Sequence, residues 1–121
     1  MTFESNASSV SVKLEIRKLG DDYLVSIGGG DKVHIGSVVL AVPRPSLGDP
    51  AETSCTSSVL NRLGHKDEAV CRVVAETLCK HYGKVVVCVG GIHVDHIREN
   101  QFDEIFSSVD DLLRQVMKMS G

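Results

Sequence analysis

The stretch KVVVCVGGIHVD, residues 84–95, decides the fold of this chain. Its run of valines contains no charged residue and is long enough for a strand that is buried on both faces. The strand ends in Gly90 and Gly91, which carry no side chains, and His93 and Asp95 follow directly. Such an ending indicates either a plain turn or a ligand site beside a central strand, where backbone can approach a ligand closely.

Three segments upstream also have strand patterns. Residues 10–17 alternate strictly between apolar and polar side chains, which predicts a half-buried strand. Residues 22–27 follow a turn at Gly20 and predict the second arm of a hairpin. Residues 34–42 are almost continuously apolar, so they predict another central strand, which two prolines should end.

Two helices complete the pattern. Residues 67–83 and 100–119 carry apolar side chains at three- and four-residue spacing, and Gly83 suits the position after a helix. The order β-β-β-α-β-α predicts an α+β fold, with a single mixed β-sheet and two helices packed mainly on one face. Two helices leave apolar surface of such a sheet uncovered, and we therefore expect a homodimer.

The rest of the chain sets the predicted domain organisation. Residues 1–9 are polar and predict a flexible N-terminal tail, and residues 10–121 predict a single α/β domain. Within it, residues 43–64 show no periodic pattern and predict a long loop. Loops of this length in compact domains are usually functional or disordered.

Composition excludes several classes of protein. The chain has 121 residues, a formal net charge of −3 and only 4% aromatic residues. It has no basic stripe, so nucleic acid is not the expected partner. No apolar run approaches the roughly 20 residues that span a bilayer, and the polar N-terminus does not resemble a secretory signal. The four cysteines form no C-x-x-C pair, and we expect a cytoplasmic protein with free thiols.

Polar residues gather at the predicted element ends, in segments 28–36, 53–58, 64–67 and 91–95. Strand ends and helix N-termini meet at one rim in sheets with crossover helices, so we expect these segments to form one pocket. A helix that opens with Gly64, His65 and Lys66 offers N–H groups and positive charge to an anion, and serine hydroxyls could complete that site. Each segment also has a simpler interpretation, as a turn, a solvated loop or a surface charge.

The sequence can be compared with two classes of catalytic site, a metal site and a serine hydrolase triad. A metal site could use His34, His65, His93 and Asp95, although no paired motif such as H-E-x-x-H is present. A serine hydrolase would need a G-x-S-x-G elbow, which the sequence lacks. The glycine-rich stretch at 28–30 leads into a strand and does not form a nucleotide-binding loop.

Three of these segments, taken together, resemble a known family. GGDKVHIG at 29–36, GHKDE at 64–68 and GIHVD at 91–95 occur in the same order, and the similarity extends from about residue 10 to 118. The chain resembles the prenylated-flavin chaperone-like family, which accompanies UbiD-type hydroxyarylic acid decarboxylases. That family includes the small D-type subunit of gallate decarboxylase.

The resemblance implies an accessory protein without catalytic activity of its own. Such a protein would bind prenylated FMN or the apo-decarboxylase, with the UbiD-type subunit as its partner and the flavin prenyltransferase as a further candidate. The phosphate could lie at the 64–66 helix start with Ser57 and Ser58, and His34, His65 and His93 could contact the ring. The candidate cofactor-binding residues are Gly29, Asp31, His34, Gly36, Ser57, Ser58, Gly64, His65, Lys66, Gly91, His93 and Asp95.

Two alternatives stay open beside this interpretation. One is a small metal-dependent enzyme that uses the clustered histidines and aspartates. The other is a homodimeric assembly chaperone that binds no ligand and acts through its apolar surface.

Overall fold

The computed structural model describes residues 1–5, 9–62 and 67–119. These residues form one mixed β-sheet and two helices. In chain order the elements are β1 (Thr2–Ser5), β2 (Val12–Leu19), β3 (Asp22–Gly30), β4 (Lys32–Pro45), β5 (Thr53–Asn61), α1 (Glu68–Tyr82), β6 (Val86–His93) and α2 (Glu99–Met119). The strand order across the sheet is β1-β2-β3-β6-β4-β5.

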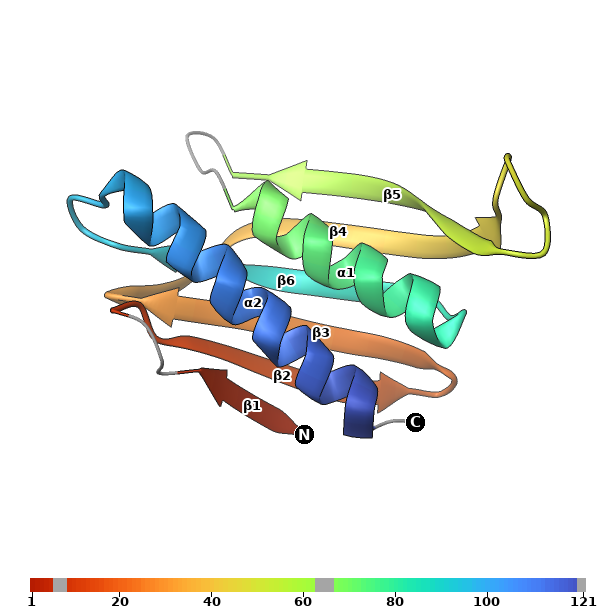
Figure 1. The fold of residues 1–121 in the computed structure, drawn as a ribbon, viewed down its shortest axis with the longest axis horizontal. Helices are drawn as coiled ribbons and strands as arrows, with labels where there is room; N and C mark the ends of the chain where they lie inside the picture. The colour runs from red at the N-terminus through yellow and green to blue at the C-terminus, as the bar shows by residue number, and fades with distance from the viewer. Residues whose placement is uncertain (6–8, 63–66, 120–121) are drawn as a thin grey trace.

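The molecule has two layers, a sheet and a pair of helices that lie on the same face of it (Figure 1). Strands β3 and β6 are parallel, and the other neighbours are antiparallel. The predicted α+β class, with one mixed sheet and both helices on one face, is therefore confirmed. The two strands predicted to be central, β4 and β6, do lie inside the sheet.

The core lies between the two layers. Alternate side chains of the strands point toward the helices, among them Leu14, Val25 and Val39, which are fully buried. Leu78 of α1 and Leu112 of α2 meet them, and each such side chain contributes about 1.5–3 kcal/mol by leaving water. In the described part of the chain, neither helix is long and apolar enough to cross a membrane.

Two predictions about irregular segments are wrong. Residues 2–5 of the expected tail pair with β2 as an edge strand, with Phe3 buried against the core. Residues 53–61 of the expected 43–64 loop form β5, which pairs with β4 along its whole length. Strand β4 also continues through Pro43 to Pro45. Its pairing with β6 ends at Ala41, so beyond that residue the missing N–H groups of the prolines interrupt no hydrogen bonds on that side of β4.

An irregularity in β4 shapes the functional region. Val33 pairs with Ile92 and Ser37 pairs with Gly90, so three residues of β4 stand opposite the single residue Gly91 of β6. Such a bulge bends the strand and redirects its side chains, and bulges are frequent beside active sites. The three residues are 34–36, and the bulge therefore sets the position of His34.

Candidate functional site

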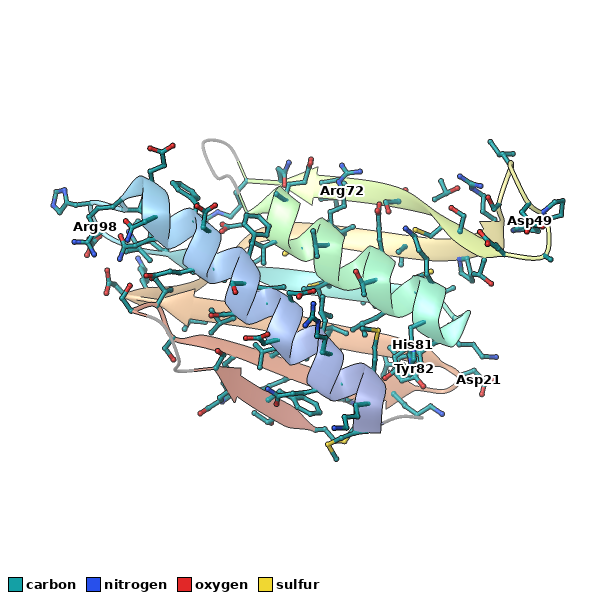
Figure 2. All side chains as sticks on the ribbon, in the orientation of Figure 1. Asp21, Asp49, Arg72, His81, Tyr82 and Arg98 are labelled. Atoms are coloured by element: carbon teal, nitrogen blue, oxygen red, sulfur yellow. The ribbon has the colours of Figure 1, made fainter. Side chains whose placement is uncertain are left out.

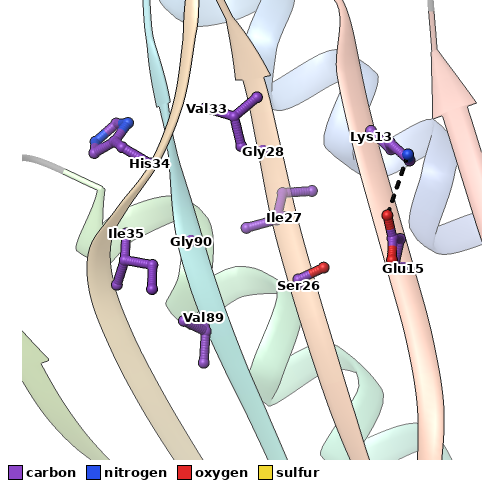
Figure 3. A pocket seen from close by; sticks show the side chains of 10 residues that line it. All are labelled: Lys13, Glu15, Ser26, Ile27, Gly28, Val33, His34, Ile35, Val89 and Gly90. Atoms are coloured by element: carbon purple, nitrogen blue, oxygen red, sulfur yellow. Dashed lines mark ion pairs between the residues drawn. The ribbon is translucent and has the colours of Figure 1, made fainter.

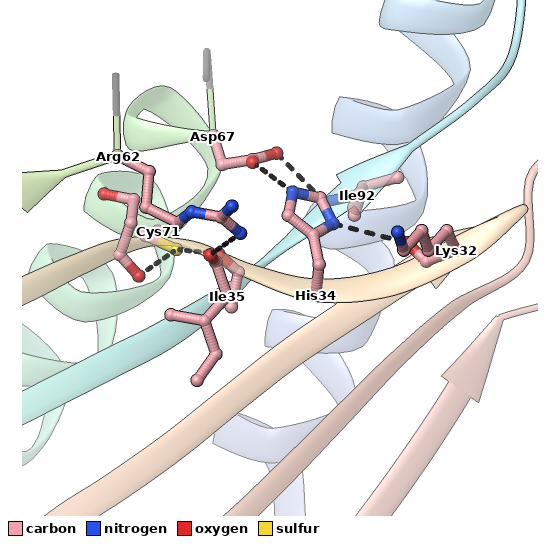
Figure 4. Close-up of polar contacts among 9 residues, drawn as sticks. Lys32, His34, Ile35, Arg62, Asp67, Cys71 and Ile92 are labelled. Carbon is pink, nitrogen blue, oxygen red and sulfur yellow. Dashed lines mark hydrogen bonds and ion pairs between the residues drawn. The ribbon is translucent and has the colours of Figure 1, made fainter. Parts of the chain in front are cut away.

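Asp67, directly before α1, links three separate elements. Its Oδ1 accepts a hydrogen bond of 3.0 Å from the Ile92 backbone N–H of β6, and its Oδ2 lies 2.8 Å from His34 Nε2 of β4 (Figure 4). The side chains of Asp67 and His34 are only 9% and 10% exposed. Asp67 occupies the N-cap position of α1 but makes no side-chain capping bond, since its carboxylate is directed across to the sheet.

Gly36 and Gly91 lie so close to the Asp67–His34 pair that a side chain at either position would have no room. A Cβ added at Gly91 would lie 2.6 Å from Asp67 Cγ and 2.9 Å from His34 Nε2, and one added at Gly36 would overlap the same carboxylate. Gly90 has a φ of 145°, which side-chain-bearing residues rarely adopt. Gly91, inside β6, is therefore required by the buried carboxylate and imidazole, whereas a Cβ at Gly90 would overlap the backbone oxygen of Ile27.

Asp31, His93 and Asp95 form a second polar cluster at the same rim. The Asp31 N–H donates to the His93 carbonyl at 2.7 Å, and the Asp95 N–H donates to Asp31 Oδ2 at 2.8 Å. His93 Nε2 lies 2.9 Å from Asp95 Oδ1. The His93 ring stands edge-on to the His34 ring, with 6.2 Å between the centroids. The segments that follow the parallel strands β3 and β6 therefore meet, as expected of such ends.

An open groove of about 410 Å³ begins beside His34 (Figure 3). Its walls are mostly apolar, with Val33, Ile35 and Val89 around a floor that includes Gly28 and Gly90. Val33 and Ile35 are 75% and 58% exposed. Val33 covers Gly28, since its Cγ1 lies 2.9 Å from where a Cβ of residue 28 would stand, and Gly90 is buried as well. The aliphatic side chains therefore provide most of the surface that a ring could contact.

A cationic pocket of about 250 Å³ adjoins the groove through His34, which lines both. Its other walls are Lys32, Arg62 and His93. The Arg62 guanidinium is held in place because Nη1 donates to the Ile35 carbonyl at 3.1 Å (Figure 4). Within residues 1–5, 9–62 and 67–119, neither Lys32 nor Arg62 forms an ion pair with a carboxylate. Their positive charges are therefore available to an anion.

The predicted site residues divide into three groups. Those that gather at the rim are Gly29, Asp31, His34, Gly36, Gly91, His93 and Asp95. Gly64, His65 and Lys66 lie outside the described residues. Ser57 and Ser58 do not join the rim: Ser57 donates to the Glu76 carboxylate, and Ser58 pairs with Leu40 in the middle of the edge strand β5.

Sequence reasoning missed several residues of this region. Lys32 and Arg62 carry its free positive charge, and neither was a candidate. Asp67 lies in the predicted polar segment 64–67 but was not among the candidate binding residues. Its place in the GHKDE motif, beside residues already considered, was the available signal.

Aromatic side chains contribute little to the site. Tyr23 and Tyr82 stack on each other, with 4.1 Å between ring centroids. Tyr82 lies at the end of the molecule opposite Arg98, which follows the His93–Asp95 segment (Figure 2). Any ring bound in the groove would therefore contact mainly aliphatic side chains.

Three of the four cysteines lie in the core. Cys71, Cys79 and Cys88 are fully buried, and Cys55 is partly exposed. A hydrogen bond from Cys88 lowers the pKa of Cys71, and the same contact raises the pKa of Cys88 well above its usual value. Burial raises the pKa of Cys79 to about 11. Because all three side chains are fully buried, they act as packing groups of the core.

The described residues contain no group of three or more His, Cys, Asp or Glu side chains arranged to hold a metal ion. His65, one of the four ligands of the metal alternative, is not among them. The binding surface that the described residues provide is an apolar groove joined to a cationic pocket.

The chain is similar to proteins of one known family. The sequence pattern of the prenylated flavin chaperone LpdD-like domain matches residues 6–120. Protein LpdD of Lactiplantibacillus plantarum is 26% identical to this chain over 116 residues, which cover 96% of this chain and 82% of that protein. The match includes both the groove and the cationic pocket. The chain belongs to the prenylated flavin chaperone LpdD-like family.

Proposed function

We propose that this protein binds prenylated FMN and delivers it to a UbiD-type hydroxyarylic acid decarboxylase. The observation that carries the proposal is the junction at His34 between an apolar groove and a pocket lined by the cationic side chains of Lys32 and Arg62. Prenylated FMN has the same two-part chemistry, since it joins an extended, largely apolar ring system to a phosphate. The family name supports a chaperone role rather than a catalytic one.

The ring would occupy the groove. Its volume lies within the range of about 300–1,000 Å³ typical of small-molecule sites. Val33, Ile35 and Val89 would contact the added prenyl ring and the isoalloxazine. His34, held through Nε2 by Asp67 and through Nδ1 by the Lys32 carbonyl, would form a fixed part of the groove wall beside the ring.

The phosphate would occupy the cationic pocket. Arg62 and Lys32 supply charge, and His93 supplies a further ring nitrogen. This placement differs from the one predicted from sequence, where Ser57 and Ser58 were to help, because both serines lie about 10 Å or more along β5 from Asn61 at the rim. The segment with Gly64, His65 and Lys66 connects Arg62 to Asp67, and we keep its residues as candidates for the same role.

The first test is anaerobic native mass spectrometry of the untagged protein after co-expression with a flavin prenyltransferase. We expect a bound mass equal to that of prenylated FMN. The double variant Lys32→Gln/Arg62→Gln should lose that mass, and Lys84→Gln, an exposed lysine outside the pocket, should keep it. A wild-type protein that emerges without flavin would overturn cofactor carriage.

The second test concerns delivery to the enzyme. Loaded protein is mixed with purified apo-decarboxylase, and decarboxylation of a hydroxyarylic acid is followed. We expect faster activation than with free prenylated FMN at the same concentration, and a slower gain with the His93→Ala variant. Equal activation rates with and without the protein would contradict a role in delivery.

A further inference from the structure

Strand β5 (Thr53–Asn61) forms one edge of the sheet and is open to pairing with a further strand. It pairs with β4 in regular register along all nine residues, and among the described residues no strand lies on its other side (Figure 1). Its sequence contains neither a charged residue nor a proline. Natural edge strands are protected by such residues, by bulges or by short length, and the opposite edge, β1, has only four residues. Strand β5 therefore lacks the usual protection against pairing with another chain.

The hydrogen-bond pattern shows which backbone groups of β5 point outward. The Arg62 N–H donates to the Gly36 carbonyl and the Ser46 N–H donates to the Glu52 carbonyl, each at 2.9 Å. These two residue pairs continue the register of β4 and β5 beyond its two ends. Because bonded pairs alternate with non-bonded pairs in an antiparallel ladder, the even-numbered residues of β5 bond to β4. The odd-numbered residues of β5 therefore turn their N–H and C=O groups away from the sheet.

The helix side of this edge is negatively charged. Ser57 donates to the Glu76 carboxylate and Asn61 donates to the Glu68 carboxylate, so α1 places two glutamates above β5. Arg72 lies between them, 3.0 Å from Glu68 and 3.9 Å from Glu76. Two carboxylates and one guanidinium give the row an excess of negative charge. A strand added to β5 would therefore gain from basic side chains on this side.

The opposite side of the same edge is apolar. Leu60 of β5 is 73% exposed there, and Leu40 and Val42 of β4, which share this face with it, are 39% and 43% exposed. A strand added to β5 would place apolar side chains beside them. Successive residues of a strand point to opposite faces, so the segment that fits this edge alternates apolar and basic residues.

The edge leads to the proposed phosphate site. Strand β5 ends at Asn61, and the next residue, Arg62, lines the cationic pocket together with Lys32 and His93. A segment paired along β5 would therefore reach this pocket with one of its ends. Delivery of a cofactor requires the receiving enzyme to contact its carrier beside the bound cofactor, and the position of β5 meets this requirement.

We infer that β5 is the docking site for an extended segment of the receiving decarboxylase, in which apolar and basic residues alternate. The segment adds a seventh strand to the six-stranded sheet. Backbone hydrogen bonds with the odd-numbered residues of β5 hold it, and Glu68 and Glu76 select its basic side chains. The identity of this partner rests on the proposed function, whereas the open edge and its charge do not.

The test compares Ser57→Pro with Ser57→Ala in binding to the apo-decarboxylase, measured by biolayer interferometry without flavin. Proline removes an N–H that points away from β4, whereas alanine keeps this N–H and removes only the hydroxyl that bonds Glu76. Circular dichroism checks that both variants fold. We expect Ser57→Pro to bind the enzyme at least about tenfold more weakly than the wild type, and Ser57→Ala to bind like the wild type.

A second comparison changes charge and leaves the backbone of β5 intact. The double variant Glu68→Gln/Glu76→Gln should bind the apo-decarboxylase several-fold more weakly at low salt, and the difference should shrink as salt is added. The control is Glu99→Gln, which removes an exposed carboxylate at the start of α2 and should bind like the wild type. An unchanged affinity in the double variant would overturn the basic character of the segment.

The possible results separate this inference from cofactor carriage. Equal binding by the wild type and Ser57→Pro, or no binding by the wild type, would overturn the inference, even if native mass spectrometry finds prenylated FMN on the protein. A change in the oligomeric state of Ser57→Pro alone would also overturn it, because a second copy would then occupy the edge. A wild type that binds the enzyme through β5 but carries no flavin would establish the docking edge while removing cofactor carriage.

Discussion

The Asp67 carboxylate and the His34 imidazole lie 2.8 Å apart although 33 residues separate them in the chain. The pair fastens the start of α1 to the bulge of β4, and the second carboxylate oxygen of Asp67 fastens both to β6 through the Ile92 N–H. His34 lines both the apolar groove and the cationic pocket. The orientation of one buried carboxylate therefore fixes the residue shared by the two halves of the proposed site.

Replacement of Asp67 by alanine should destabilise the fold. It removes the hydrogen-bond acceptor of the Ile92 N–H and the partner of a nearly buried His34, and we expect the free energy of unfolding to fall by about 2–4 kcal/mol. Urea unfolding followed by circular dichroism gives this value. The control is Asp110→Ala, which breaks an exposed ion pair with Arg114 and should cost under about 0.5 kcal/mol. Equal losses in the two variants would contradict a structural role for Asp67.

Replacement of Gly91 by alanine should also destabilise the protein, because the added methyl group would press on Asp67 and His34. We expect a cost of about 1–3 kcal/mol, as for other overpacked sites. Gly48→Ala is a matched control, since its Cβ would meet only Ser46 Oγ at 3.9 Å. The destabilisation caused by Gly91→Ala should be smaller when Asp67 is already alanine, because the added methyl group then has more room. If the double variant instead loses the sum of the two single losses, the methyl group does not clash with Asp67.

Much of the fold could be predicted from the sequence, because its core elements carry strong periodic patterns. The alternation of residues 10–17 corresponds to β2, and Gly83 does end α1 in a left-handed conformation, with its N–H donating to the Cys79 carbonyl. Strand β5 was missed because it is an edge strand with many hydroxyl residues. It pairs only with β4, so its sequence did not need an apolar alternation.

The candidate site was predictable only in part. The glycine and histidine segments at the ends of β3 and β6 were expected to meet, and the Asp31 N–H does donate to the His93 carbonyl. The role of Asp67 could not be derived, because it depends on a three-residue bulge whose register no local pattern encodes. Arg62 was overlooked for a related reason: its segment was assigned to a loop, and only the pairing of β5 brings it beside the bulge.

Removal of single positive charges should weaken cofactor binding without altering the fold. We expect Lys32→Gln to lower the affinity for prenylated FMN roughly tenfold, in line with the loss of about 1.5 kcal/mol from a hydrogen bond to a charged group. Lys84→Gln, also exposed but outside the pocket, should bind like the wild type. Anaerobic fluorescence titration measures both affinities. An unchanged affinity in Lys32→Gln would exclude this pocket as the phosphate site.

The Cys79 thiol should make the protein less stable at alkaline pH. Burial raises its pKa from 9.0 to about 11, so between these values the unfolded chain loses a proton that the folded chain keeps. The unfolded state then binds fewer protons, and the free energy of unfolding must fall as pH rises through this window. Below pH 9 the thiol is protonated in both states and contributes no slope. Urea unfolding at several pH values should therefore give a shallower decline for Cys79→Ala than for the wild type, and identical slopes would contradict the raised pKa.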